Sequence, residues 1–586
     1  MGRLRQQLYT HKKLFFLIFL SIVLIFPRLG ENVLQIDEAG DSFHSLTTLK
    51  FGYPAISDGI NEFGRNISPD GILKLQPWFT FYVRALSLYL FGQNSFAARF
   101  PSALLGVLSV PLLYLLTFKL SQRQNEAFIA TLLFICSVPL LLYFRTARYI
   151  AFQIPFTLLI IWFYIQMLEH KKWSATGFTL SSVLLFHSMY VVCAGVLTGI
   201  LLHLIAYERN KKQVKQFFLV FLIIFFLTAP WILYIYPVFE TVNSFYATAT
   251  GIPYKTDIPS LTIRFFSFFF QINNYIFPLI FLLFVSKNFY TKDYLLKHKE
   301  LVLITIVIIA TVGISTINYI PMQQYIAGIL PLFHVFAARI VCNLRRMQKP
   351  VIITLIIGLL TLTNVIHVGP LFAFKGIDYL SGNKIKESLR DTEYFRGPIS
   401  TFYWQVQFKS VFLQYLYEIT HQYRGPLDGI VKYVKKHGGE DDTFLMNHED
   451  ISFAFHTNLR QIYEIPFPEP PDWIILRKKS PIGSVLKKTV ENRAEIKKKE
   501  DFYRKYVFDY MKNNNYQKIV LDYPARYGNN LFEIQLHQFK TPKSDRNVVI
   551  YRHLRNTDFT VQPSATTKDD KRQKTKDKRK DRISYT

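Results

Sequence analysis

The sequence predicts a polytopic α-helical membrane protein that carries an α/β domain outside the membrane. Three observations indicate this class. Apolar stretches long enough to cross a bilayer recur through the first 370 residues, half of the 586 residues are apolar, and the residues after Pro370 alternate β-like and helix-like runs. The net charge of +28 lies largely in connectors and in the C-terminal part. A nucleic-acid partner is therefore not expected.

The apolar stretches predict about eleven transmembrane helices. We expect these spans at 13–28, 97–118, 126–144, 148–168, 173–189, 190–207, 216–236, 275–287, 300–318, 324–342 and 350–370. No small-x-small cleavage pattern follows Pro27, so the first stretch is predicted to remain as a span rather than to be removed as a signal. The three cysteines lie far apart within apolar stretches, which favours packing over metal binding or disulfide formation.

Lysine and arginine fall in alternate connectors, for example at Lys119 and Lys171, and this pattern predicts the orientation. Together with the basic N-terminus, they place the N-terminus in the cytoplasm. The turn around Arg145 and everything after residue 370 are then expected on the opposite face. We predict a multi-pass protein of the plasma or inner membrane with an extracytoplasmic C-terminal domain.

Three parts are predicted along the chain. Residues 1–370 form the membrane part, which includes a long first external loop at 29–96. Residues 371–560 are expected to form the extracytoplasmic α/β domain, with a strand at 473–476. The basic, low-complexity segment 561–586 is expected to be disordered.

The first external loop has two distinct ends. Its later end, 78–92, is apolar and aromatic with Arg84 in the middle, which suits a segment lying flat in the membrane interface. Glycines and prolines between Gly52 and Gly71 argue against long regular elements in the middle of the loop.

Two adjacent carboxylates, Asp37 and Glu38, follow the first apolar stretch close to the expected membrane surface. Carboxylates at such a boundary are costly unless they stay hydrated, pair with cations or take part in chemistry. Neighbouring residues point in different directions on a helix or strand, so the two are not expected to face one target together. A solvated loop after a membrane anchor is the alternative interpretation.

Five motifs occur in order along the expected membrane part. They are Asp37-Glu38, Gln76-Pro77-Trp78, the run from Leu90 through Ala98-Arg99-Phe100-Pro101-Ser102 to Gly106, Ala147-Arg148-Tyr149, and Gln324-Tyr325 with Pro331. In this combination they resemble the dolichyl-phosphate-mannose protein mannosyltransferase superfamily, which includes bacterial enzymes that add aminoarabinose to lipid A. The resemblance covers roughly residues 10–345. The chain departs from the family in lacking a β-trefoil insertion, and in Gln76, where relatives often carry a basic residue or histidine.

The resemblance implies a GT-C-type membrane fold and a glycosyltransferase activity. Members take a sugar from a polyprenyl-phosphate carrier and pass it to an acceptor on the outer or lumenal face. The expected partners are therefore a polyprenyl-phosphate-linked sugar, the bilayer, and a glycan, lipid or protein acceptor. No cofactor or metal is predicted, because Asp37-Glu38 lacks a histidine or second carboxylate at helical spacing. A divalent cation bridging Asp37 and the phosphate has no support in the residues.

Such a reaction needs a base, cations for the departing phosphate and a groove for the isoprenoid tail. We expect Asp37 to act as the general base. Glu38 is expected to have either a direct role or a structural ion pair within the loop. A single base without an evident nucleophile predicts a one-step displacement that inverts the anomeric configuration.

Basic residues of the expected outer face are the candidates to hold the phosphate. Arg148 is the first candidate and Arg145 the second, with Lys74 and Arg84 behind them. The guanidinium fork suits phosphate oxygens, whereas headgroup anchoring is the alternative for the two turn arginines. We predict that Asp37 and Arg148 lie close enough for one phosphosugar to touch both.

The remaining candidates are expected to line the groove or meet the acceptor. They are Gln76, His187, Tyr190, Gln324 and Tyr325. A polar tip wetted at the interface is the favoured alternative for His187 and Tyr190, and an aromatic belt is an equal alternative for Gln324 and Tyr325. Arg99 is expected to anchor at the interface or to pair with an acidic residue of the loop.

Two other classes of function compete with the enzyme. A transporter or flippase of a lipid-linked sugar would use similar basic and aromatic residues but would need no base. A sensor with the C-terminal domain as ligand binder would need far fewer spans than the sequence predicts. Replacing Asp37 by asparagine separates the first two, because only an enzyme should lose its turnover.

Overall fold

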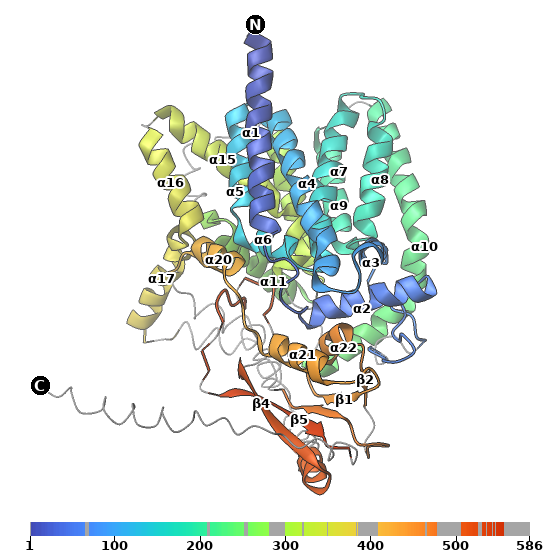
Figure 1. Ribbon diagram of the computed structural model, residues 1–586. Helices are drawn as coiled ribbons and strands as arrows, with labels where there is room; N and C mark the ends of the chain where they lie inside the picture. Colours follow the sequence, from blue (N-terminus) through green and yellow to red (C-terminus); the bar gives the residue numbers. More distant parts are fainter. Residues whose placement is uncertain are drawn as a thin grey trace, which may run out of the picture.

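The structure is a computed structural model. It describes residues 2–64, 70–74, 76–207, 211–250, 256–280, 299–318, 321–347, 350–382, 384, 408–462, 466–477, 505–525, 530–534, 536–541, 543–544 and 546–555. A bundle of helices occupies one end, with the N-terminus at its tip, and a smaller mixed unit of strands and helices covers the other end (Figure 1). Helices α2 and α3 lie between the two, at the end of the bundle far from the N-terminus.

The helical part runs from α1 to α17. Its elements are α1 Gly2–Ile25, α2 Ile36–Phe51, α3 Phe79–Phe91, α4 Ser95–Ser121, α5 Gln124–Ile135, α6 Val138–Phe144, α7 Ile150–Leu168, α8 Ser174–Phe186, α9 Tyr190–Tyr207, α10 Lys211–Thr250, α11 Ile258–Gln271, the π-helical turn η1 Ile272–Ile276, α14 Lys299–Ser315, the 3-10 turn η2 Gln323–Ile329, α15 Leu330–Met347, α16 Pro350–Leu362 and α17 Val365–Leu380.

Five described segments are long and apolar enough to cross a membrane, or seven if each of two bent helix pairs forms one span. The five are α4, α7, α9, 213–238 within α10, and 323–343. The predicted count of about eleven is therefore not reached within the described residues. The predicted span 173–189 corresponds to the short helix α8, and most of 275–287 lies outside the described residues.

Two predicted spans are broken. The sequence predicts one helix over 126–144, but α5 and α6 meet at a bend of 67°. Pro139 stands in the first turn of α6, where its missing N–H is tolerated, while its ring prevents α5 from continuing through it. The second break, of 71°, separates 354–362 from α17. Helix α17 runs on through Pro370 to Leu380, so the change of composition at 370 does not coincide with the end of a helix.

Helix α10 is longer than the sequence predicts. The expected span ends at 236, yet the helix continues through Pro237 to Thr250, for 40 residues in all. At about 1.5 Å per residue it is about 60 Å long, roughly twice the thickness of a bilayer core. The residues that follow the predicted span, up to Thr250, are therefore helical as well.

The start of the first external loop is also helical. The Gln35 side chain caps α2 by accepting a hydrogen bond from the Asp37 N–H. The Glu38 side chain in turn accepts a hydrogen bond from the N–H of Gln35. Gly52 ends the helix at φ 81°, a left-handed conformation that favours glycine. Helix α3 packs against α2 through a face that includes Phe81 and Leu88, while Tyr89 and Leu90 on its other face are exposed.

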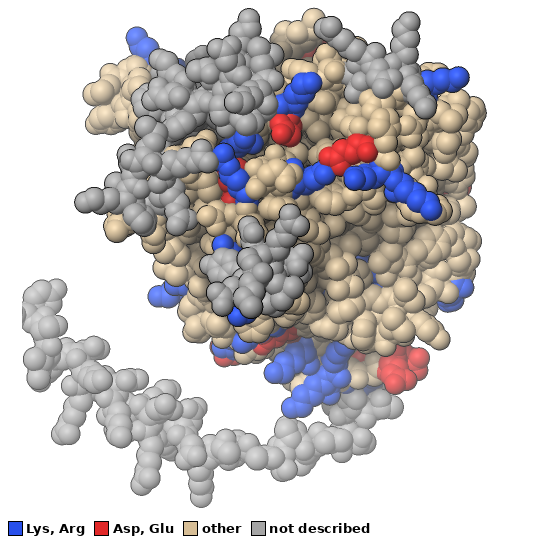
Figure 2. Space-filling view, turned by 90° about the horizontal axis from the view of Figure 1, so that it is seen from above, with Lys and Arg blue, Asp and Glu red and all other residues tan. Residues whose placement is uncertain are grey.

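Among the described residues, lysine and arginine side chains, with fewer acidic ones, are scattered over the end of the bundle at which the N-terminus lies (Figure 2). Some are paired there, such as Lys119 with Glu169 at 2.7 Å. Large apolar side chains are exposed on the outer helices instead, including Phe218 and Leu233 of α10. A charged end and an apolar flank are the pattern expected of a helical bundle in a bilayer.

The C-terminal unit is built on a five-stranded sheet with strand order β2-β1-β3-β5-β4. Its elements are α20 Val411–Thr420, α21 Pro426–His437, β1 Thr443–Met446, α22 Asp450–Thr457, β2 Arg460–Gln461, β3 Trp473–Ile475, β4 Tyr516–Pro524 and β5 Asn547–His553. Strand β1 pairs in parallel with β2 and β3, whereas β5 pairs antiparallel with β3 and β4. The strand expected at 473–476 is present as β3.

Helices α21 and α22 hold the sheet against the first external loop. The Val33 N–H donates to Asp428 of α21 at 2.8 Å, and the Leu34 N–H donates to His456 of α22 at 3.0 Å. Asn61 exchanges two further hydrogen bonds with the segment 459–461. The sheet and the acidic start of α2 therefore lie on the same end of the molecule.

Candidate functional site

Asp37 stands in the first turn of α2, where the unpaired N–H groups of a helix favour an anionic side chain. Its backbone is well held, but its carboxylate accepts no hydrogen bond and forms no ion pair within the described part of the chain. The side chain is exposed. Asp37 is thus the member of the acidic pair that remains available to a ligand.

Glu38 is fully engaged. Its two carboxylate oxygens accept hydrogen bonds from Arg99, each at 2.8 Å, and further bonds from the N–H groups of Ala147 and Gln35. Burial raises the pKa of Glu38, but Arg99 and these hydrogen bonds outweigh it and hold the pKa below its usual range. Of the two alternatives for Glu38, the geometry is that of the structural ion pair, with Arg99 as its partner.

Arg148 lies beside Asp37, in the turn between α6 and α7. Its Nη1 donates to Oδ1 of Asp41 at 2.7 Å and to the backbone oxygen of Asp37 at 3.2 Å. Its Nε is buried and has no hydrogen-bond partner among the described residues. An unpaired buried donor costs about 1–3 kcal/mol. Nε is therefore free to donate to a ligand oxygen.

Asp41 joins the two arginines of the site. It lies one helical turn after Asp37, on the same face of α2. Besides Arg148 it approaches Arg84 of α3, at 3.9 Å, and its Oδ2 accepts no hydrogen bond within the described residues. Burial lowers the pKa of Arg148, but Asp41 and Asp37 outweigh it and raise that pKa, so Arg148 stays cationic.

The expectation that no second carboxylate stands at helical spacing from Asp37 is wrong, because α2 makes Asp41 that residue. Asp41 is nevertheless bound to Arg148. Among the described residues, no group of three or more histidines, cysteines, aspartates and glutamates is arranged to hold a metal ion.

Three more residues complete the surroundings of Asp37 and Arg148. The Arg148 guanidinium lies over the ring of Tyr149 at 5.1 Å, and Tyr325 lies within electrostatic range of Arg148. Glu533 approaches from the C-terminal part, within electrostatic range of Asp37 and Arg148, and is 8% exposed. We call Asp37, Asp41, Arg84, Arg148, Tyr149, Tyr325 and Glu533 the acidic–basic cluster.

Glu533 should make stability depend on pH. Burial and then the nearby Asp37 raise its pKa from 4.5 to about 8. Between these values the folded protein keeps a proton that the unfolded chain has lost, so stability should fall as the pH rises from 4.5 to 8. In Glu533→Gln this loss, on the order of a few kcal/mol, should disappear. Thermal unfolding of the wild type and the variant from pH 5 to 8.5 measures this loss. If the stability of both proteins changed with pH in the same way, the raised pKa of Glu533 would be contradicted.

The other arginine of the turn has different partners. Arg145 Nη1 donates to the backbone oxygens of Ile25, at 2.6 Å, and Pro27, at 2.8 Å, and so binds carbonyls at the end of α1. It also lines a cavity of about 70 Å³ with Glu38 and Arg99. The structure therefore separates Arg145 from Arg148, although they are close in sequence.

The remaining predicted site residues lie outside the acidic–basic cluster. Lys74 pairs with Asp70 and lies over the ring of Tyr234 at 4.7 Å. The ring of His187 meets Trp231 at 6.0 Å, and Trp231 in turn meets Trp78 at 5.4 Å. These rings form an aromatic group at the junction of α8, α10 and the start of α3.

Gln76, Tyr190 and Gln324 also lie outside the acidic–basic cluster. The Gln76 Oε1 and the Gln324 Oε1 are buried without a hydrogen-bond partner among the described residues. The backbone oxygen of Gln324 accepts a hydrogen bond from Gln153 of α7, and the ring of Tyr190 packs against Phe186. Of the five groove candidates, only Tyr325 is brought to Arg148.

Comparison with known proteins finds a family match over part of the chain. Residues 75–234 match the sequence model of the family described as dolichyl-phosphate-mannose-protein mannosyltransferase. An uncharacterized protein of Aquifex aeolicus (strain VF5) is 25% identical over 237 residues, which make up 38% of this chain and 44% of that protein. The match thus spans less than half the length of that relative. Over residues 75–234 the match agrees with the resemblance to the dolichyl-phosphate-mannose protein mannosyltransferase superfamily that the motifs indicate.

Solved structures with a related arrangement are more distant in sequence. ArnT from Cupriavidus metallidurans in the apo state has a TM-score of 0.44 and 11% identity, covering 96% of this chain and 100% of that chain. ArnT from Cupriavidus metallidurans bound to undecaprenyl phosphate has a TM-score of 0.46 and 10% identity, and the match covers 93% of this chain and 98% of that chain. AglB from Archaeoglobus fulgidus, in complex with an inhibitory peptide and a dolichol-phosphate, has a TM-score of 0.41 and 10% identity, covering 80% and 70%.

Proposed function

We propose that this chain, which resembles the mannosyltransferase family over residues 75–234, is a membrane glycosyltransferase. It transfers a sugar from a polyprenyl-phosphate carrier to an acceptor on the extracytoplasmic face. The observation that carries the proposal is the proximity of Asp37, whose carboxylate accepts no hydrogen bond within the described residues, to the buried Arg148, whose Nε has no acceptor among them. A base and an anion-binding donor, side by side, are what a phosphosugar reaction requires.

In the proposed reaction Asp37 removes the proton from an acceptor hydroxyl or amine. The acceptor atom then bonds to the anomeric carbon of the donor sugar, while the bond between that carbon and the phosphate oxygen breaks. The electron pair leaves with the polyprenyl phosphate, whose charge Arg148 stabilises. The displacement inverts the anomeric configuration, and the reaction as written uses no metal ion.

The charge distribution supports the proposed orientation. The basic end at which the N-terminus lies would face the cytoplasm (Figure 2), and the acidic–basic cluster would face the other side. Helix α3 would then lie at the extracytoplasmic interface, with its exposed apolar face toward lipid. The C-terminal unit would cover the cluster from the same side, where it could meet an acceptor.

The lipids that copurify with the protein test the donor class. We expect mass spectrometry of extracted lipids to find a polyprenyl phosphate or its glycosylated form, enriched over a control multi-span membrane protein prepared in the same way. The sugar and the carrier would be identified together. Absence of any such enrichment, combined with no transfer from polyprenyl-phosphate sugars in vitro, would argue against the proposal.

Arg148 and Arg145 form a matched pair for testing phosphate recognition. Arg148→Gln should lower kcat/KM for the donor by about 10²–10³-fold, because it removes a donor aimed at the leaving phosphate. Arg145→Gln, which loses the bonds to the Ile25 and Pro27 carbonyls and the contact with the ring of Tyr415, should change kcat/KM far less. Kinetics with purified donor, and size-exclusion profiles to verify folding, measure both. Equal losses in the two variants would contradict a specific role for Arg148.

A further inference from the structure

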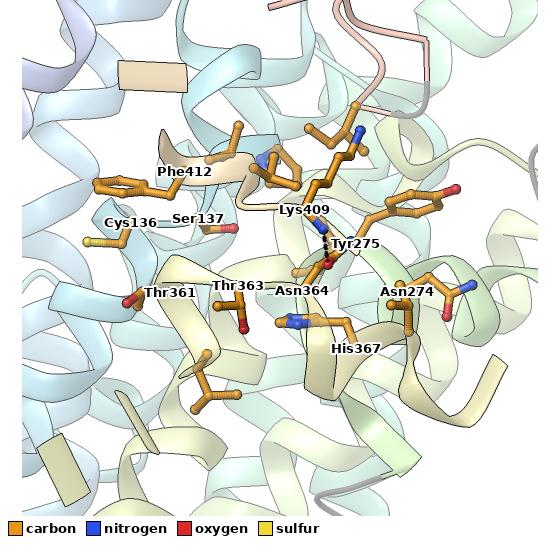
Figure 3. Close-up of a pocket in the computed structure, with 17 residues that line it drawn as sticks. Cys136, Ser137, Asn274, Tyr275, Thr361, Thr363, Asn364, His367, Lys409 and Phe412 are labelled. Atoms are coloured by element: carbon orange, nitrogen blue, oxygen red, sulfur yellow. Dashed lines mark hydrogen bonds between the residues drawn. The ribbon is translucent and has the colours of Figure 1, made fainter. Parts of the chain in front are cut away.

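A cavity of about 170 Å³ lies beside the bend between α5 and α6. The bend between α16 and α17, the turn η1 and the start of α20 complete its wall (Figure 3). Neither Asp37 nor Arg148 lines it. A smaller cavity of about 30 Å³ adjoins it and shares wall residues such as Cys136 and His367.

Three polar side chains in the wall each keep a buried atom without a hydrogen-bond partner among the described residues. These atoms are Ser137 Oγ, Asn274 Nδ2 and His367 Nδ1, on side chains that are 8%, 3% and 8% exposed. Buried polar atoms are normally paired, and each unpaired one costs about 1–3 kcal/mol. Three such side chains stand in the wall of one cavity, and a polar ligand held there would supply their partners once these side chains turn toward it.

The chemistry of the three atoms defines the ligand. Asn274 Nδ2 donates only, and the oxygen of Asn274 already accepts from Asn273. The His367 ring is hydrogen-bonded to the backbone of Ile276, so Nδ1 of the neutral ring is an acceptor. Ser137 does both. Hydroxyl groups, which donate and accept, satisfy this mixed set, whereas an anion or a cation would satisfy only part of it.

The cavity also has a suitable size and wall. One water-sized group needs roughly 10–15 Å³ measured in the same way, so the cavity admits about a dozen non-hydrogen atoms, which is one sugar ring. Apolar residues such as Phe412 and Val138 supply surface for the C–H faces of a ring. Lys409 is the one charged residue of the described wall, and it is exposed. Its N–H bonds to Asn364 (Figure 3).

We propose that this cavity binds a hydroxyl-rich group of the size of one sugar ring. The proposal that a ligand binds here is argued from the cavity and its wall and does not depend on the proposed function. Only the source of the sugar, either the carrier-linked donor or a glycan acceptor, rests on the proposed function. The segment at 533–534 links the two places, because Ile534 lines the cavity and Glu533 interacts with Asp37 and Arg148.

Saturation-transfer NMR tests the site on the full-length protein in nanodiscs free of glycosidic detergent. The probes are methyl β-D-glucopyranoside and methyl α-D-mannopyranoside, and a fully O-methylated glucoside serves as the matched ligand without donors. We expect signals from the ring protons of the free glycosides. The signals should fall by about five-fold or more in Asn274→Leu, as expected for one hydrogen bond, and should be weak for the O-methylated probe.

Asp37→Asn is the control variant, and it should keep the NMR signal even though transfer is lost. His367→Gln gives a second test should Asn274→Leu fail to fold. Competition by a sugar-bearing carrier but not by the bare polyprenyl phosphate would assign the site to the donor sugar, and competition by neither would assign it to the acceptor. Signals unchanged in both cavity variants, or equal signals from the O-methylated probe, would overturn the proposal and leave a cavity that holds only water. Loss of transfer without loss of binding would bear on the proposed function alone.

Discussion

An Asp37→Asn variant should lose sugar transfer by about 10²–10⁴-fold while it keeps its fold. Asparagine has nearly the same shape as aspartate but cannot take the proton of the acceptor. The hydrogen bonds that place Asp37 come from its backbone N–H and oxygen, so the substitution leaves them intact. Single-turnover transfer from a polyprenyl-phosphate sugar, with donor binding measured separately, checks the result.

Asp58→Asn is a suitable control for this experiment. Asp58 lies in the same predicted external loop, where its carboxylate accepts hydrogen bonds from the N–H groups of Ile60 and Asn61. Its replacement should leave transfer within about two-fold of the wild type, since the side chain lies away from the acidic–basic cluster and asparagine can still accept both hydrogen bonds. If Asp37→Asn retained full flux of the lipid-linked sugar, the flippase interpretation would be favoured over the enzyme.

Glu38→Ala should destabilise the protein by about 3–5 kcal/mol, although Glu38 is adjacent to the proposed base. The substitution leaves Arg99 as an uncompensated charge, 9% exposed, and removes acceptors from the N–H groups of Ala147 and Gln35. We expect a large loss of folded protein in fluorescence-detected size exclusion and a lower unfolding temperature. Neighbouring carboxylates would then give opposite phenotypes, one catalytic and one structural.

Two controls sharpen this second experiment. Glu31→Ala breaks the exposed pair between Glu31 and Arg28 and should cost less than about 1 kcal/mol. The double variant Glu38→Leu with Arg99→Met removes both charges and should recover much of the stability lost in Glu38→Ala. If Glu38→Ala were as stable as Glu31→Ala, the buried pair would not be structurally important.

The predicted spans 97–118, 148–168 and 190–207 correspond to the uninterrupted helices α4, α7 and α9, whereas the prediction is less accurate where the backbone bends. Composition alone cannot locate the break between α5 and α6, because the run stays apolar across Pro139. The motifs correctly place Asp37 near Arg148, since both stand next to the same end of the helical bundle. Local pattern and topology were sufficient for that part of the site.

Other parts of the site have weaker signals. Helix α2 begins with Gln35, which is a less common cap than serine, threonine or aspartate, so its Gln-x-x-Glu capping box is easily missed. Once the helix is known, the spacing of Asp37 and Asp41 identifies Asp41 as the partner of Arg148. Glu533 carries no local signal, because only tertiary packing brings the C-terminal segment to α2.

The hydrogen bonds that tie Val33 and Leu34 to α21 and α22 have a consequence for biogenesis. These groups lie near the N-terminus, yet their partners leave the ribosome only after the helical bundle has been synthesised. Helices can insert one by one during translation, but the chain entering α2 cannot be locked until the late segment docks on it. The segment that leads into α2 therefore acquires its full set of contacts only after synthesis has passed α22.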